Sequence, residues 1–201
     1  MNRPAHGLPF ALTTLRLALT PLLLWIVRDG TAGLPYVAII LVAFTSDIFD
    51  GVIARNLGIS TAGLRRYDSR TDLVFYATAA WTVWLVHPEE IRRVAPLLAV
   101  LITLELVRPA FDIAKFGKQS SYHSYSAKTF GVAVVLALVL LMGFGIGGIF
   151  ITAAIALGIL ADIEGLTMSL MLPVWTHDVK SVFHARKLRG QSSLAAENAP
   201  L

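Results

Sequence analysis

Two acidic segments, S-D-I-F-D-G-V-I-A-R at residues 46–55 and D-S-R-T-D at residues 68–72, interrupt a chain that is otherwise strongly apolar. The aspartates of the first segment are three positions apart and those of the second are four apart, so on helices each pair shares one face. Two facing helices would therefore bring four carboxylates into one small space. These carboxylates belong to Asp47, Asp50, Asp68 and Asp72.

Four carboxylates at membrane depth are unfavourable unless cations accompany them. They repel one another, and each loses several kcal/mol of hydration when it leaves water. Hard divalent cations prefer carboxylate oxygens as ligands. The spacing of the four acids therefore predicts a divalent metal site.

The composition is that of an integral membrane protein. Of 201 residues, 56% are hydrophobic and 15% are charged, whereas the apolar share of soluble domains is about 45–50%. Several apolar runs approach the ~20 residues that a helix needs to cross a bilayer. Because backbone polar groups must be satisfied inside lipid, such spans are helical, and we expect an all-α fold. The chain has no cysteine, which excludes disulfides and thiolate metal sites.

Hydropathy predicts a polytopic membrane protein with six transmembrane helices. One domain, residues 1–175, holds all six, and a cytoplasmic tail follows at residues 176–201. We expect the polar end of this tail, residues 192–201, to be disordered. The expected spans are 8–27, about 36–55, about 68–87, about 94–113, about 127–144 and about 149–175.

Charge asymmetry between alternate loops predicts the orientation in the membrane. The N-terminus, the 55–70 loop, the 115–128 connector and the tail carry twelve Lys and Arg residues, whereas the opposite side carries three. Basic loops stay in the cytoplasm. The termini and the four acids should therefore lie on the cytoplasmic side of the inner membrane. The net charge of +4 favours anionic lipid headgroups and phosphorylated substrates over nucleic acid as partners.

Small residues follow the first two acids at helical spacing. Gly51 lies four residues after Asp47, and Ala54 lies four after Asp50, which leaves room for a ligand beside each carboxylate. The alternative is close helix packing through small residues. Arg55 comes next, where a guanidinium could hold a phosphate. Its alternative role is that of a cytoplasmic anchor.

These residues resemble the signature of the CDP-alcohol phosphotransferases, the membrane enzymes of phospholipid headgroup synthesis. The signature is D-x-x-D-G-x-x-A-R, eight residues, G, three residues, D, three residues, D. This chain matches it at every fixed position except the second glycine, where Leu64 stands. The departure affects the backbone that enters the third span. In the first span L-T-T-L-R is similar to the family's L-T-x-x-R, and we expect Arg16 to turn toward a polar cavity instead of snorkelling to the interface.

The resemblance implies a role for each matching residue. Asp47, Asp50 and Asp68 would bind two divalent ions, Mg²⁺ or Mn²⁺, and Asp72 would complete the metal site and act as general base. The positions implied to contact the cytidine nucleotide are Gly51, Ala54, Arg55 and Thr61.

Residues beyond the signature are weaker candidates. A cation and a hydroxyl suit a phosphorylated acceptor, and Arg108, Lys128 and Thr129 lie where related enzymes hold the acceptor's polar group. The alternative is interfacial anchoring. The acids of the later spans, Glu105, Asp162 and Glu164, must be paired or face water. The five histidines lack metal-ligand spacing, so we expect no zinc site.

The resemblance therefore implies a metal-dependent membrane transferase. It would move a phosphatidyl or similar phosphoalcohol group from a CDP-linked donor, preferably CDP-diacylglycerol, to a polar hydroxyl acceptor and release CMP, working as a homodimer among membrane lipids. The acceptor could be glycerol 3-phosphate, inositol phosphate, serine or a less usual alcohol. Two alternatives are a polytopic transporter or cation-binding protein that uses the same acids as an ion site, and a family member that binds lipid without catalysis.

Overall fold

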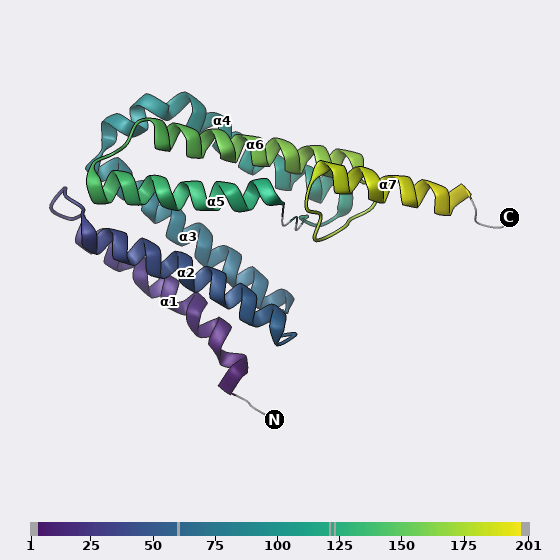
Figure 1. Cartoon of the computed structure of the whole chain (residues 1–201), viewed down its shortest axis with the longest axis horizontal. Helices are drawn as coiled ribbons and strands as arrows, with labels where there is room; N and C mark the ends of the chain where they lie inside the picture. The colour runs from purple at the N-terminus through teal and green to yellow at the C-terminus, as the bar shows by residue number, and fades with distance from the viewer. Residues whose placement is uncertain (1–3, 60, 121, 123, 198–201) are drawn as a thin grey trace. The chain divides into compact units, whose positions relative to one another are not determined.

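The structure is all-α, as the sequence predicts. It is a computed structural model that describes residues 4–59, 61–120, 122 and 124–197, and in these ranges it contains helices and turns but no strand. The helices follow one another along the chain with short connections (Figure 1). They are α1 Pro4–Ile26, α2 Leu34–Asn56, α3 Ala62–Val86, α4 Pro88–Phe116, α5 Tyr125–Leu138, the π-helix η1 Val139–Gly143, α6 Ile149–Met171 and α7 Val182–Glu197.

Five of the described helical segments are long and apolar enough to cross a membrane, namely Gly7–Ile26, Leu34–Ala54, Pro88–Phe116, Tyr125–Gly143 and Ile149–Met171. Helix α3 falls below that apolarity because charged residues fill its first half. It has 25 residues, and at about 1.5 Å per residue it is long enough for a ~30 Å hydrocarbon core. Five apolar spans with α3 as a sixth are compatible with the predicted six-helix architecture.

Helix α3 begins earlier than the predicted start at Asp68. Thr61 is its N-cap, and the backbone N–H of Leu64 donates to the Thr61 hydroxyl oxygen at 3.2 Å. Such a cap satisfies a backbone donor that the first helical turn leaves without a partner. Leu64 has no positive φ, so the backbone here does not require glycine. The Leu64 substitution therefore leaves the entry into α3 helical.

The end of the chain corrects the prediction of disorder. Helix α7 runs to Glu197, so residues 192–197 are helical. Its start is fixed by burial, because Ala185, together with Val179 just before the helix, packs with Met168 and Leu172 at the end of α6. Ser181 caps α7 by accepting a hydrogen bond from the N–H of His184 at 3.3 Å. Residues 192–197 of the expected disordered segment therefore continue a helix, and residues 198–201 lie outside the described residues.

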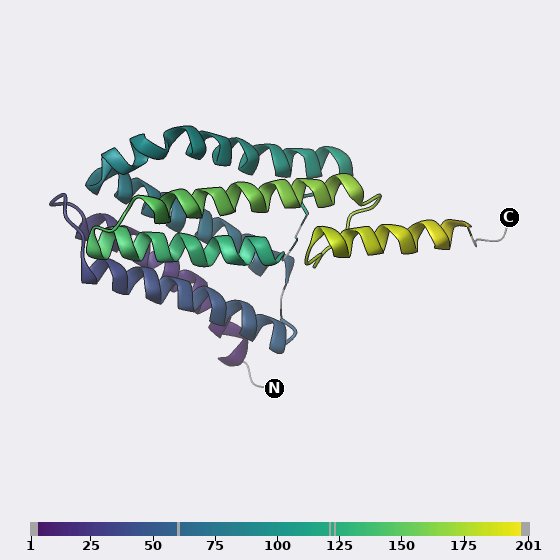
Figure 2. The same ribbon diagram turned by 45° about the horizontal axis from the view of Figure 1, so that its top comes forward.

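The described chain divides into two compact units, which we treat separately. The first unit comprises Met1–Arg93 and Val135–Gly147. In it α1 packs against both α2 and α3, and Figure 2 shows these helices side by side. Tyr36 and Thr82 share a buried hydrogen bond of 2.9 Å between α2 and α3. Helix α1 is therefore placed to reach side chains on both neighbours.

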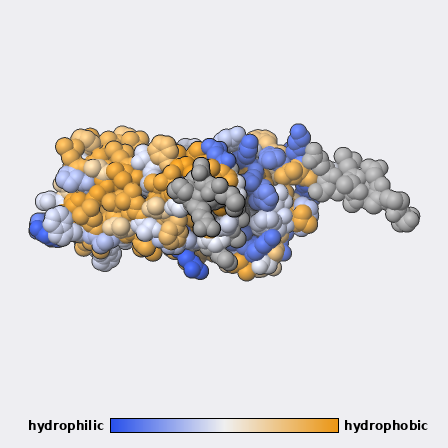
Figure 3. All heavy atoms as spheres, turned by 90° about the horizontal axis from the view of Figure 1, so that it is seen from below, coloured by the Kyte–Doolittle hydropathy of each residue, from blue (hydrophilic) through white to orange (hydrophobic). Residues whose placement is uncertain are grey.

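The second unit comprises Val94–Val134 and Gly148–Leu201. Its core is built from Val94 and Leu101 of α4 and Ile155 of α6, with Phe130 of α5 packed against them. Outside such cores the chain exposes many large apolar side chains, and Figure 3 shows a broad area of them on one face. A surface of this kind is expected where helices face lipid.

Candidate functional site

The four predicted acids meet in the first unit. Asp47 and Asp50 come from the second half of α2, and Asp68 and Asp72 come from the second and third turns of α3. One carboxylate oxygen from each of Asp47, Asp50 and Asp68 lies within 4.8 Å of the others. The two facing helices therefore bring Asp47, Asp50 and Asp68 together, and Asp72 is linked to them through Arg16.

The cluster is buried on one side and accessible on the other. The Asp50 side chain is only 5% exposed, whereas those of Asp47, Asp68 and Asp72 are 35%, 33% and 29% exposed. Carboxylate oxygens are the ligands that Mg²⁺ and Mn²⁺ prefer. The donor set and its spacing therefore fit a divalent cation that enters from the accessible side.

Arg16 of α1 lies in the middle of this cluster. Its guanidinium Nη2 is 2.6 Å from the Oδ2 of Asp50, and its Nη1 is 3.1 Å from the Oδ1 of Asp47 and 3.3 Å from the Oδ1 of Asp68. Nη1 also contacts the Oδ1 of Asp72. The side chain is fully buried. Arg16 therefore turns toward the acids, as predicted, and does not snorkel to the interface.

Thr13, the threonine of the segment that is similar to the family's L-T-x-x-R, is a further member of the site, although the sequence assigned it no role. Its hydroxyl lies 3.1 Å from the Oδ2 of Asp50 and 3.1 Å from the carbonyl oxygen of Pro9, so the hydroxyl proton is shared between two acceptors. Thr13 precedes Arg16 by three residues, which places both on one face of α1. That spacing was the available signal.

The residues predicted to contact nucleotide lie close to the acids in sequence. Gly51 and Ala54 continue the helical face of Asp47 and Asp50 on α2, and Ala54 is buried. The side chain of Arg55 lies outside the described residues. Thr61 caps α3, so its hydroxyl already has a structural partner. A nucleotide contact for these residues stays a prediction.

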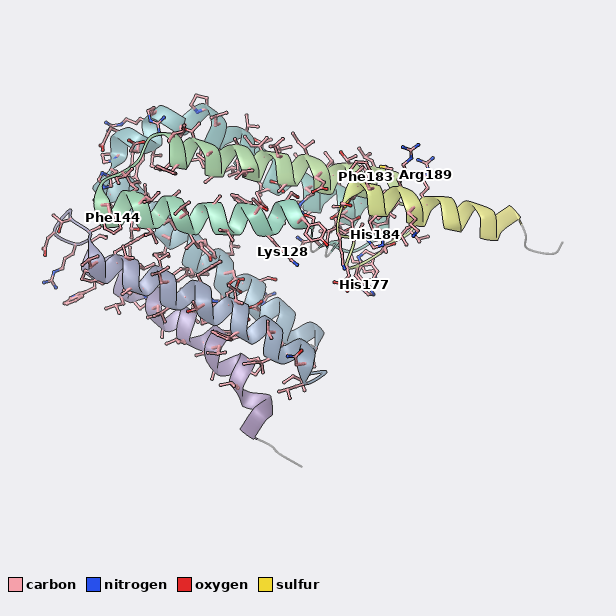
Figure 4. All side chains as sticks on the ribbon, viewed as in Figure 1. Lys128, Phe144, His177, Phe183, His184 and Arg189 are labelled. Atoms are coloured by element: carbon pink, nitrogen blue, oxygen red, sulfur yellow. The ribbon has the colours of Figure 1, made fainter. Side chains whose placement is uncertain are left out.

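The residues predicted to contact the acceptor lie in the second unit. Arg108 forms an ion pair with Asp162 of α6, with 3.3 Å between Nε and Oδ1. Lys128, in the first turn of α5 (Figure 4), faces the ring of Tyr125 at 6.0 Å. The hydroxyl of Thr129 donates to the carbonyl oxygen of Tyr125 at 2.9 Å. All three therefore have local partners, and their contact with an acceptor stays a prediction.

Of the three acids in the later spans, the buried Asp162 and the half-buried Glu164 are paired, whereas the side chain of Glu105 is exposed, so each meets the expectation of a partner or water. Besides the Arg108–Asp162 pair, Glu164 accepts hydrogen bonds from the Ser126 hydroxyl and from the backbone N–H of Val182. The second contact places a carboxylate at the N-terminus of α7, where negative charge is favourable. His123, one of the five histidines, lies outside the described residues. Asp162 and Glu164 therefore serve the packing of the second unit.

Comparison with known proteins gives the family. The family model described as CDP-alcohol phosphatidyltransferase matches residues 6–160, a range that includes Arg16 and all four acids. A search of the curated proteins finds no significant match, and neither does a search of the solved structures. Because the family match covers well over half of the sequence, the chain belongs to the CDP-alcohol phosphatidyltransferases, which transfer a phosphoalcohol group from a CDP-alcohol to an alcohol acceptor.

Proposed function

We propose that this protein transfers a phosphatidyl group from CDP-diacylglycerol to the hydroxyl of a small polar acceptor and releases CMP. The observation that carries the proposal is the convergence of three carboxylates, from Asp47, Asp50 and Asp68, within 4.8 Å in a member of this family. A diacylglycerol donor is supported by the apolar helices, which place the enzyme in the bilayer where such a lipid resides.

The same three aspartates, together with Asp72, are the residues that would hold divalent cations, Mg²⁺ or Mn²⁺. Such cations, when bound, supply the positive charge that neutralises a diphosphate during phosphoryl transfer. Arg16 and Thr13 bind the buried acid Asp50 from α1, and they thereby hold that carboxylate in a fixed orientation.

Asp72 is the proposed general base. Its carboxylate accepts the proton of the acceptor hydroxyl while the hydroxyl oxygen forms a bond to the β-phosphorus of the donor. The bond from that phosphorus to the bridging oxygen of the CMP moiety breaks, and CMP leaves with the bonding electrons. The hydroxyl proton passes to Asp72, the phosphatidyl group passes to the acceptor and CMP leaves, so no water is consumed.

The pocket for the cytidine nucleotide is proposed to lie along α2. Gly51 and Ala54 leave little side-chain volume beside the acids, and Arg55 supplies a cation for a phosphate group. A close approach of ligand to helix backbone needs small residues of this kind. Larger side chains at Gly51 or Ala54 would then weaken nucleotide binding more than cation binding.

A phosphorylated alcohol is the preferred acceptor. The support is the basic content of the 115–128 connector, with Lys115, Lys118 and Lys128, and the nearby Arg108. Phosphate esters bind such cations by charge-assisted hydrogen bonds. We also propose that the acidic site faces the cytoplasm and that the protein forms a homodimer. Contacts of the acceptor with Arg108, Lys128 and Thr129 are proposed as well.

A CMP-release assay tests this function. Purified protein in lipid nanodiscs receives CDP-diacylglycerol, Mg²⁺ or Mn²⁺, and in turn glycerol 3-phosphate, inositol phosphate and serine. We expect CMP and a new phospholipid with one acceptor, and loss of both in Asp72→Asn. If no acceptor yields CMP above the level of Asp72→Asn, the proposed transferase activity is wrong.

A further inference from the structure

We infer that Arg16 competes with divalent cations for the acidic cluster, so that it weakens cation binding when no nucleotide is present. The inference deepens the proposed function and rests on the four acids being the cation ligands. Arg16 is then a positioning residue, and its charge determines whether cations bind alone or together with the nucleotide. It follows from three features of the side chain: its contacts, its burial and its charge.

The contacts of Arg16 are with the same groups that would bind a cation. One nitrogen, Nη1, contacts carboxylates from both helices, at 3.1 Å to Asp47 and 3.3 Å to Asp68, and it also contacts Asp72. Nη1 thus lies among the carboxylate oxygens that would surround a cation, and a cation at that position would be in direct contact with it. Cation binding at those oxygens therefore requires Nη1 to withdraw.

Burial prevents Arg16 from leaving the site altogether. The side chain is 0% exposed, it extends from α1, and α1 packs against both α2 and α3. Its Nη2 is also tied to the most buried acid, Asp50, at 2.6 Å. The guanidinium can therefore loosen its contact with Asp47 and Asp68 while it stays beside the cluster. Its positive charge remains within range of any bound cation.

Charge balance then decides which ligands bind together. Four carboxylates and Arg16 leave three negative charges in the cluster. Two divalent cations would turn this into a surplus of one positive charge, which a partly buried site tolerates less well than water does. A bound diphosphate, with its own negative charges, removes the surplus. Arg16 therefore favours joint binding of cations and nucleotide over binding of cations alone.

The experiment measures Mn²⁺ affinity directly, without turnover. Purified protein is titrated with Mn²⁺ in the absence of nucleotide, and unbound Mn²⁺ is followed by electron paramagnetic resonance. Arg16→Met removes the charge and should tighten Mn²⁺ binding by about tenfold or more. Arg16→Lys keeps the charge but loses the planar fork, and it should stay within about threefold of the wild type. Unchanged or weaker Mn²⁺ binding in Arg16→Met, with helicity intact, would overturn the inference.

A second measurement uses the wild-type side chain and does not depend on whether Arg16→Met folds. The guanidinium ¹⁵N signals of Arg16, identified by their loss in Arg16→Lys, are followed during addition of Mg²⁺. Competition predicts that these signals shift as Nη1 withdraws from the carboxylates, and signals that stay constant at saturating Mg²⁺ would contradict it. Both readouts are independent of CMP release. Tighter Mn²⁺ binding without any transferase activity would therefore refute the proposed function and leave this inference standing.

Discussion

The hydroxyl of Thr13 on α1 lies 3.1 Å from the carboxylate Oδ2 of Asp50 on α2, the same oxygen that Arg16 contacts at 2.6 Å. The most buried of the four acids is thus held by two donors from one face of α1. Helix α1 therefore contributes side chains to the acidic site, although all four carboxylates come from α2 and α3. Changes on α1 should consequently alter ligand binding at the acids.

Thr13→Val should weaken Mn²⁺ binding. It removes the hydroxyl beside Asp50 and keeps the side-chain volume, and a hydrogen bond of this kind contributes about 0.5–1.5 kcal/mol, or roughly twofold to tenfold in affinity. The matched control is Thr14→Val, because that exposed hydroxyl contacts Phe10 and Tyr67 instead of an acid. Equal Mn²⁺ affinity in the two variants would show that Thr13 does not orient Asp50.

Asp50→Ala should abolish the contribution of Mg²⁺ to nucleotide binding. Without the buried carboxylate the three-oxygen cluster is incomplete, so calorimetric titration with CDP should give the same weak affinity with and without Mg²⁺. Asp29→Ala serves as the control, because Asp29 is exposed beside Arg28 and lies outside the cluster. A Mg²⁺-dependent gain in CDP affinity that persists in Asp50→Ala would exclude Asp50 as a metal ligand.

Asp162→Asn should destabilise the protein strongly. Asp162 is 5% exposed, and its partner Arg108 is 25% exposed, so the substitution leaves a largely buried cation without its counter-charge. Loss of one partner from such a pair costs about 3 kcal/mol or more. Asp178→Asn removes a carboxylate from an exposed pair with His177 and should change stability little. Thermal unfolding in detergent compares the two, and a similar small shift for both would refute a structural role for Asp162.

The acidic site was predictable from sequence because few arrangements satisfy its physics. When acids share one face of an apolar membrane helix, that face cannot point into lipid. It must face a polar site, where cations or basic side chains can neutralise the acids. The same reasoning required a polar destination for Arg16, and the structure places it at the acids. Local spacing and the cost of burying charge were sufficient here. No knowledge of the tertiary fold was needed.

Other features depend on contacts between distant parts of the chain. The partner of Arg108 is Asp162 on another helix, and nothing in local spacing selects it over other acids. Helix α7 is polar by composition, and its start is held by burial of Ala185, and of Val179 just before the helix, against the end of α6. The early start of α3 is different, since Thr61 is a recognisable N-cap and its signal was present in the sequence.

Ala185→Gln should release α7 from the second unit. Ala185 is fully buried, and glutamine is a good helix former, so the change introduces volume and polarity with only a small loss of helix propensity. Hydrogen exchange at the amides of residues 182–190 should become faster. Lys187→Gln places the same residue at an exposed position of α7 and should leave exchange unchanged. Figure 4 shows Arg189 and His184 extending from opposite edges of this helix. Equal exchange rates in both variants would mean that α7 does not depend on its buried face.

Gly158→Ala should destabilise the second unit through a steric conflict on α6. A Cβ atom at Gly158 would lie 2.7 Å from Cε2 of Phe130 and 2.9 Å from Cδ1 of Leu101, so α4 and α5 approach α6 only because this position lacks a side chain. Overpacking of this kind costs about 1–3 kcal/mol. Gly131→Ala is the matched control, since it is also helical and has no atom within 4 Å of the added Cβ. It should be neutral or stabilising by up to about 1 kcal/mol, because alanine favours helix. Thermal unfolding of the two variants measures the difference. If Gly158→Ala were as stable as Gly131→Ala, close approach of the helices at Gly158 would not be what holds the second unit together.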